Sequence, residues 1–161
     1  VSTATATVEF EKYYNGSELY AIDDVTYKNY NNKAYLPAKV LHSADAVKWY
    51  TLYTGTDVGD TELYTDDLLI QYLVTQGTPD GEERRYGLTW NAKAYILAVA
   101  QDAEGHYGPV FRKSITPSLS GISPISDLGF VTADAGTQST PVMLRVVTPA
   151  APLKRTAHVV R

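Results

Sequence analysis

Thirteen tyrosines and two tryptophans are the side chains of this 161-residue sequence best able to contact a ligand, because each joins a flat apolar ring to a polar group. Such rings can stack on the faces of sugars or anchor a protein partner. Most of them stand in segments that read as strands, where an aromatic side chain is an ordinary sheet residue. The aromatic residues that we predict to be available to a glycan or to another surface protein are Tyr20, Tyr27, Tyr30, Trp90 and Tyr107.

Side chains suited to catalysis or to metal binding are scattered along the chain. The histidines His42, His106 and His158 lie far apart and lack the paired spacing of zinc ligands. The absence of cysteine excludes a thiol nucleophile, and the short motifs of serine hydrolases, P-loop proteins and dinucleotide-binding proteins do not occur. Acidic loops at 57–62 and 102–104 could offer oxygen ligands to calcium, but plain turns explain them as well. We therefore expect no catalytic residue, no metal site and no cofactor.

The charge balance and the hydropathy pattern disfavour two classes of partner. Fourteen basic and eighteen acidic residues leave a net charge of −4, which does not favour binding to nucleic acid or to an anionic lipid surface. No apolar run is long enough to span a membrane. The N-terminal residues lack the basic and apolar regions of a signal peptide. We expect either a cytosolic protein or a trimmed, mature part of an exported one.

The elements that must position these side chains are mostly strands, since apolar and polar residues alternate over much of the chain. Pro37 predicts an edge position or a bulge for its strand, because proline lacks an N–H group for the sheet. The residues from Asp102 to Gly105 predict a hairpin turn between the last two of the main strands. The expected main strands are 8–11, 34–41, 47–53, 94–100 and 109–115.

One helix is predicted over residues 66–76. Thr65 or Asp66 can cap its first turn, and Gly77 followed by Pro79 ends it. Its apolar residues recur with helical spacing and define the face that should be buried. These residues are Leu68, Leu69, Tyr72 and Leu73.

The remaining segments are expected to be irregular or weakly β. In the excursion 15–33, Asn15 and Gly16 predict a turn and residues 25–30 a helical turn. Residues 78–85 read as a polar loop. After Pro117 the composition changes to Ser, Gly, Pro, Thr and Ala. Weaker strands are expected there at 128–132, 142–147 and 157–160.

Several motifs between residues 34 and 117 resemble a known family. They are Leu88-Thr-Trp-Asn91, the strand 94–100, the Gly-centred hairpin 101–110 and Ile115-Thr-Pro117. Their order resembles that of a fibronectin type III-like β-sandwich, in which a Leu-x-Pro-Gly turn is followed by a tyrosine corner. Together with the inserted helix, the pattern is similar to domains of exported surface lipoproteins of Bacteroidetes. The resemblance implies that Trp49 lies in the core of the sandwich.

The sequence departs from the family pattern at two places. Trp90 replaces the Pro of the turn, and Ala94 stands at the corner position with Tyr95 one residue later, so the corner is either missing or shifted. If the alanines of strand 94–100 face inward, Leu97 and Val99 face outward and need a cover. The helix 66–76 and the tail strand 142–147 are the two available covers.

These observations predict an all-β fold. We expect an Ig- or fibronectin type III-like antiparallel β-sandwich over 1–117, with a short helix at about 66–76 and the excursion 15–33, and a β-rich extension over 118–161. The extension either packs on the sandwich or begins another module. The resemblance implies a non-catalytic domain of the cell exterior, suspected to belong to an outer-membrane lipoprotein whose signal segment is not in this chain. Its expected role is that of a spacer, adhesion or ligand-binding module, or alternatively of an accessory carbohydrate-binding module.

Overall fold

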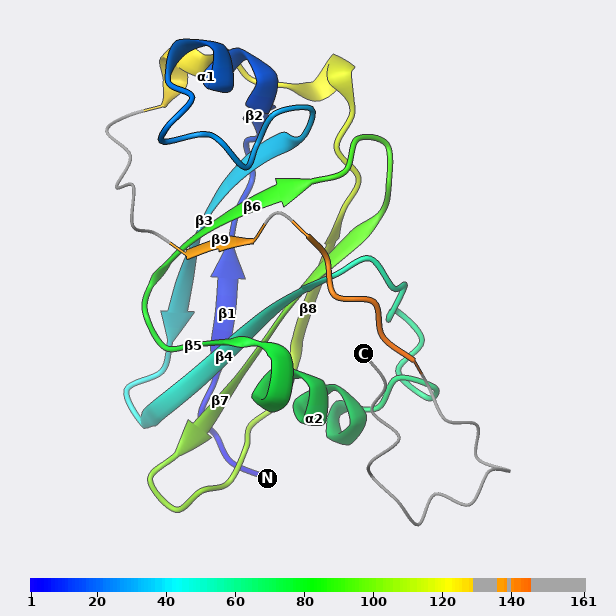
Figure 1. The fold of residues 1–161 in the computed structure, drawn as a ribbon. Coiled ribbons are helices and arrows are strands. Elements are labelled where there is room, and N and C mark those ends of the chain that lie inside the picture. The colour runs from blue at the N-terminus through cyan, green and yellow to red at the C-terminus, as the bar shows by residue number, and fades with distance from the viewer. Residues whose placement is uncertain (129–135, 139, 146–161) are drawn as a thin grey trace.

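Two β-sheets lie face to face in the computed structural model, which describes residues 1–128, 136–138 and 140–145 (Figure 1). The first sheet has five strands: β1 (Ala6–Glu9), β2 (Tyr14–Asn15), β3 (Ala34–His42), β6 (Glu83–Leu88) and β9 (Gly136–Gln138). Strands β1, β3, β6 and β9 lie in that order, and β2 pairs with β3 beside β1. Only the pairing of β6 with β9 is parallel among these described strands.

The second sheet has four antiparallel strands: β4 (Ala46–Thr54), β5 (Thr78–Pro79), β7 (Ala94–Asp102) and β8 (Phe111–Ile115). Their order across the sheet is β5, β4, β7, β8, so that the hairpin β7–β8 forms one side of it. Two α-helices, α1 (Gly16–Ile22) and α2 (Asp66–Gln76), and two short 3-10 helices at Leu119–Gly121 and Ile125–Asp127 complete the described fold. The chain is therefore built mostly of strands in antiparallel sheets, in agreement with the all-β prediction.

The main core lies between the two sheets. Along β7, Ala94, Ile96, Ala98 and Ala100 point into it, as the alternation of the strand predicts. They meet inward residues of the first sheet such as Leu36 and Tyr86, both of which are fully buried. Trp49 packs only partly against this core: its indole N–H donates to the carbonyl of Gly81 at 2.8 Å and its ring stacks on His42. The expectation that Trp49 lies in the core is thus only partly met.

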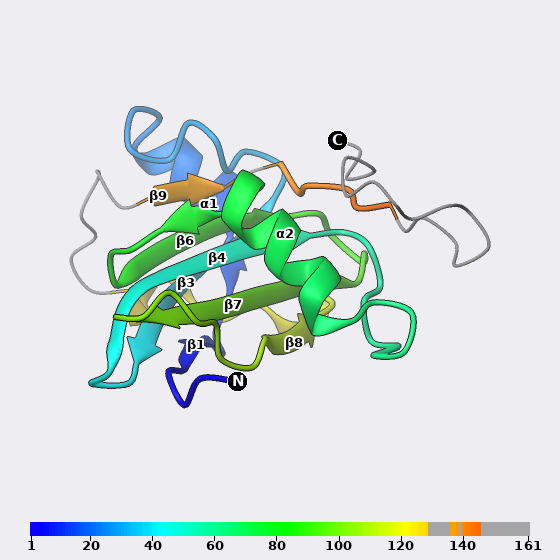
Figure 2. The ribbon, with the colours of Figure 1, turned by 90° about the horizontal axis from the view of Figure 1, so that it is seen from below.

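A second core covers the outer face of the second sheet and confirms the need for a cover. Leu97 and Val99 have no exposed surface, because α2 lies across β4 and β7 (Figure 2). Leu69 and Leu73 of α2 are fully buried against them, and Leu144 from the C-terminal extension joins the same cluster. Both of the covers foreseen from the sequence therefore contribute.

Helix α2 has the bounds that the sequence predicts, and its first turn is capped by one of the two predicted residues. The hydroxyl of Thr65 accepts the N–H of Leu68 and caps the first turn. Gly77 ends the helix in an extended conformation, not in the left-handed one of a usual C-terminal glycine. A Cβ atom at Gly77 would lie 2.3 Å from the carbonyl oxygen of Leu73 and 2.7 Å from that of Thr51. Glycine is needed here for the close approach of two backbone segments.

A third, smaller core explains most of the tyrosine-rich excursion. Tyr14, Tyr30 and Tyr35 are buried and Tyr27 is half-buried, and their rings gather on the outer face of the first sheet. The rings of Tyr30 and Tyr35 meet edge to face with centroids 4.7 Å apart. Arg85 of β6 is also buried, with its guanidinium carbon 5.8 Å from the centroid of Tyr30. We call these four tyrosines and Arg85 the tyrosine cluster.

Three predicted elements are wrong in the structure. The pair Asn15 and Gly16 is not a turn: the side chain of Asn15 caps α1 by accepting the N–H of Ser17, and residues 25–30 form turns after that helix. Residues 83–85 of the predicted polar loop belong to strand β6. Pro37 lies in the central strand β3 and not at an edge; at its position β3 pairs with β6, while β1 and β2 pair only beyond it on either side. The N–H that Pro37 lacks has no strand partner to meet on that side.

The described part of the C-terminal extension contacts both sheets. Strand β9 adds to the edge of β6, and Val142 pairs in parallel with Thr54 at the end of β4. The predicted strand 142–147 is thus present only as this single bridge in its described part, while residues 129–132 and 157–160 of the other two predicted tail strands lie outside the described residues. No helix in the described ranges has both the length and the apolarity needed to cross a bilayer.

Candidate functional site

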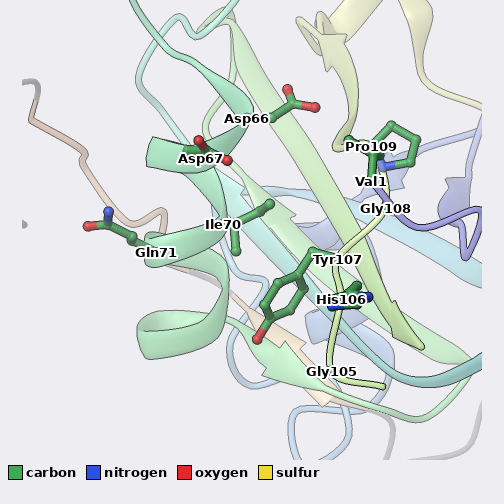
Figure 3. A pocket seen from close by; sticks show the side chains of 10 residues that line it. All are labelled: Val1, Asp66, Asp67, Ile70, Gln71, Gly105, His106, Tyr107, Gly108 and Pro109. Atoms are coloured by element: carbon green, nitrogen blue, oxygen red, sulfur yellow. The ribbon is translucent and has the colours of Figure 1, made fainter. Parts of the chain in front are cut away.

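A groove of about 640 Å³ lies between the first half of α2 and the loop that joins β7 to β8 (Figure 3). One wall carries side chains of α2, and the other carries residues 105–109 of the loop, with Val1 beside them. From α2 the groove is lined by Asp66, Asp67, Ile70 and Gln71. Of the five aromatic residues predicted to be available to a ligand, Tyr107 is the one that lines this groove.

The loop wall is shaped by hydrogen bonds around Asp102. The Asp102 carboxylate accepts the backbone N–H groups of Glu104 and His106, both at 2.9 Å. Gly105 closes the turn with a φ of +87°, a conformation that favours glycine. The next residues are held from the other side, since Ser2 donates its N–H to the carbonyl of Tyr107. The loop thus presents the Tyr107 side chain toward α2 from a braced backbone (Figure 3).

Gly108 allows this bracing. A Cβ atom at this position would lie 1.8 Å from the carbonyl oxygen of Ala4, so that any larger residue would push the N-terminal segment away. The N–H of Gly108 donates to the carbonyl of Ala100 on β7. The sequence pattern identified Gly108 only as part of the Gly-centred hairpin 101–110.

Asp66 connects the two walls of the groove. Its carboxylate accepts the N–H of Val110 at 3.0 Å and a guanidinium N–H of Arg112 at 2.9 Å. The same guanidinium donates to the carbonyl of Val58 at 2.6 Å, and the Arg112 side chain is largely buried. Asp66 was interpreted from the sequence as a helix-capping acid alone. Its second role, a link between α2 and β8, depends on residues more than forty positions away.

The groove combines an apolar surface with polar groups. The Tyr107 ring is half-buried and packs with Ile70 against the outer core of the second sheet. Burial raises the pKa of Tyr107 above its usual value near 10. Its hydroxyl, protonated at neutral pH like that of any tyrosine, can both donate and accept a hydrogen bond. Asp67, Gln71 and His106 add an anion, an amide and an imidazole at the rim. This arrangement suits a ligand that has both an apolar face and hydroxyl or amide groups.

Asp102, Glu104 and His106 also form a group of potential metal ligands in the described part of the chain. Their ligand atoms lie within 4.8 Å of one another. Two of these residues are exposed, and the Asp102 carboxylate already serves the backbone of the turn. We assign the group a structural role in the loop. Of the three histidines, His42 is the last residue of β3, His106 lies in the β7–β8 loop, and His158 lies outside the described residues.

The structure places the other aromatic candidates away from the groove. Tyr27 and Tyr30 belong to the tyrosine cluster, in which Tyr30 has no exposed surface to offer to a ligand. Tyr20 is half-buried on α1, and α1 lies at the opposite end of the fold from α2 (Figure 1). Trp90 follows β6, is half-buried, and meets Tyr13 edge to face at 6.3 Å. The five residues therefore do not converge on a single site.

The polar residues of the groove were not foreseen as binding residues. Asp67 and Gln71 stand one helical turn apart on α2, and this spacing places them on one side of a helix. That signal was present in the sequence, but nothing in the sequence indicated that this side of α2 would face the β7–β8 loop. No family model, no curated protein and no solved structure matches the chain.

Proposed function

We propose that this chain is a non-catalytic, fibronectin type III-like domain of an exported or cell-surface protein, and that it acts as a ligand-binding module through the groove at Tyr107. The strand order supports the type III comparison. Strands β1, β3 and β6 lie against β5, β4, β7 and β8, which is a division of three strands against four with one hairpin on the four-stranded side. The edge strand β9 and the helix α2 are additions to this plan.

In place of the family's tyrosine corner, we propose that Tyr53 holds the connection between β6 and β7. Tyr95 points to the outer face of its sheet, where its hydroxyl lies near the loop at Gly59. The hydroxyl of Tyr53 on β4 lies within hydrogen-bonding reach of Thr89, in the connection between β6 and β7. Tyr53 is buried and can therefore hold that connection in place of a corner tyrosine.

Four of the acidic residues have a structural explanation. Hydrogen bonds from the backbone N–H of Thr26 and Gly59 lower the pKa values of Asp23 and Asp57, and the hydroxyls of Ser43 and Ser2 lower those of Asp45 and Asp102. A general acid needs a carboxyl pKa raised toward neutrality. These carboxylates instead stay ionised and cap turns, which is a structural task.

The groove is the observation that carries the ligand-binding proposal. It presents a half-buried tyrosine ring beside Ile70, with Asp67, Gln71 and His106 around them. A carbohydrate is the second, more specific candidate, because a sugar has one apolar C–H face that stacks on an aromatic ring and a rim of hydroxyls for carboxylate and amide partners. The alternative is a spacer without any ligand, and the experiment must distinguish this spacer from a ligand-binding module.

The test is a glycan-array screen of the full chain with two tyrosine variants. We expect binding by the wild-type chain, a loss of about tenfold or more for Tyr107→Ala, and no change for Tyr20→Ala. Tyr20 is the matched control because it is also a half-buried tyrosine, but lies on α1. Binding that survives Tyr107→Ala and disappears in Tyr20→Ala would move the site to the excursion. Absence of binding to any glycan would remove the carbohydrate candidate and favour a spacer or a protein ligand.

The exported location is tested on the full-length protein in its own cells. We expect a signal peptide followed by a lipid-modified cysteine upstream of this domain, and cleavage of the domain by a protease added to intact cells. A domain that is cut only after lysis would contradict the proposal.

A further inference from the structure

The described end of the chain approaches α2 in an extended conformation and is held there mainly through its backbone. Residues 141–145 follow β9 and run from the end of β4 to the side of α2 (Figure 1). Leu144 is buried in the core between α2 and the second sheet, whereas Met143 is 58% exposed. One side chain therefore enters the protein, while its neighbour faces solvent.

Two hydroxyl groups of the body recognise the backbone of this segment. Thr56 accepts the N–H of Leu144 at 2.8 Å and donates to its carbonyl at 3.4 Å. Tyr72, on the buried face of α2, accepts the N–H of Arg145 at 3.1 Å and donates to its carbonyl at 2.5 Å. Each hydroxyl thus satisfies both the donor and the acceptor of one residue, regardless of the side chain that residue carries.

A strand-like contact completes the recognition. The N–H of Val142 donates to the carbonyl of Tyr53 at 2.9 Å, and Val142 forms a parallel bridge with Thr54. Main-chain pairing to a strand, together with a buried site for an alternate side chain, is one of the ways in which proteins bind extended peptides from other molecules. We call the residues that provide these contacts, Tyr53, Thr54, Thr56 and Tyr72, the docking surface.

We propose that the docking surface is a binding site for an extended peptide of the form Val-x-Leu, and that its partner in trans is residues 142–145 of a second copy of this chain. The segment seen here is the ligand bound in cis. The second copy is the partner that fits, because its segment carries the Val, the Leu and the spacing that the surface accommodates. An exchange of identical segments between copies creates no new contacts and therefore needs little additional stabilisation.

The cis contact predicts how this exchange depends on concentration. A tethered segment competes with a free one at an effective concentration in the millimolar range. The wild-type chain should therefore remain monomeric when dilute, and weakening the cis segment should open the surface to another copy. This proposal does not depend on the groove at Tyr107, since it uses none of the residues assigned to ligand binding there.

The experiment uses two full-length variants that complement each other. Leu144→Asp leaves the docking surface intact but impairs binding by segment 142–145. The double variant Thr56→Ala, Tyr72→Phe leaves the segment intact but removes hydrogen-bonding hydroxyls from the docking surface. We expect each variant alone to be monomeric by light scattering after size exclusion, and the equimolar mixture to form a one-to-one dimer. Circular dichroism controls for folding, and Val142→Pro, which lacks the N–H donated to Tyr53, replaces Leu144→Asp if that variant unfolds.

A labelled peptide of residues 140–145 separates the site from its partner. We expect it to bind the Leu144→Asp chain, and to bind at least about tenfold more weakly when Tyr72→Phe is added, because two hydrogen bonds to the peptide backbone are lost. The same peptide with Asp in place of Leu144 is the control. Peptide binding without a mixed dimer would retain the site but overturn the second copy as its partner. A folded Leu144→Asp chain that binds no peptide would overturn the whole proposal.

Discussion

Arg84 offers the most decisive test of what holds the two sheets together. This arginine lies on β6 with 3% of its surface exposed, and its side chain points between the sheets. Its Nε donates to the hydroxyl of Thr51 on β4 at 2.7 Å. One terminal nitrogen donates to the carbonyls of Thr78 at 3.3 Å and Asp80 at 2.6 Å. The guanidinium therefore ties β6 to β4 and to the turn after β5.

The effect of Arg84→Met follows from two opposing contributions. Hydrogen bonds from a charged donor contribute about 1.5–3 kcal/mol each, and three of them join Arg84 to other elements. Burial of the guanidinium opposes this gain by several kcal/mol and lowers the pKa of Arg84, although the group stays ionised at neutral pH. Methionine keeps the apolar stem and removes the donors. We expect the free energy of unfolding to fall by about 2–4 kcal/mol.

Urea denaturation followed by circular dichroism measures this loss, and Lys48→Met is the matched control. Lys48 forms an ion pair with Asp80 at 3.0 Å, but both side chains are substantially exposed, so that its loss should cost much less than the loss of Arg84. Arg84→Lys should recover only a part of the stability, because an ammonium group cannot reach acceptors on three sides as a guanidinium does. Equal losses for Arg84→Met and Lys48→Met would refute the view that the buried guanidinium joins the sheets.

Two further predictions concern the outer core and the buried tyrosines. Leu73→Ala should lower the free energy of unfolding, measured in urea, by about 3 kcal/mol, because the Leu73 side chain is fully buried between α2 and the sheet. Leu68→Ala, at a half-buried position of the same helix, should lower it clearly less. Equal losses would mean that α2 is not the cover of the sheet. Burial raises the pKa values of Tyr35 and Tyr86 to about 12, above the ordinary value near 10, so their contribution to stability is complete below pH of about 10 and is lost as the pH rises from about 10 toward 12. We expect the urea midpoint to fall over this pH range, and the tyrosinate absorbance of these two residues to develop only on unfolding. A midpoint independent of pH, with all tyrosines titrating near 10, would contradict the burial of Tyr35 and Tyr86.

The sequence predicts those elements whose cause is local. Helix α2 follows from the Thr65 cap and from an apolar face that recurs with helical spacing, and β7 follows from a long apolar run bounded by a turn. The same alternation along β7 predicted that Leu97 and Val99 would need a cover. In each of these cases the interactions that decide the structure lie within a few residues of one another, so the pattern along the chain contains them.

Strand β6 could not be predicted, because two successive arginines give its sequence the polar character of a loop. Alternation places Arg84 in the main core and Arg85 in the tyrosine cluster on the other face. Each arginine becomes acceptable in its environment only through partners far away in the sequence, such as Thr51 for the first and Tyr30 for the second. A polar composition therefore concealed a central strand. For the same reason, the tyrosines of the excursion read as a possible ligand platform, although Tyr27 and Tyr30 pack in the tyrosine cluster and the ring of Tyr30 lies against Arg85, a residue of a later strand.

Helix α2 links the two proposed binding sites, and it does so with different sides of one element. Asp67 and Gln71 face the groove at Tyr107, Leu69 and Leu73 are buried against the sheet, and the hydroxyl of Tyr72 binds the backbone of Arg145. Because Asp66 also holds the start of α2 to Arg112 and Val110, the helix cannot shift toward one site without disturbing the contacts of the other.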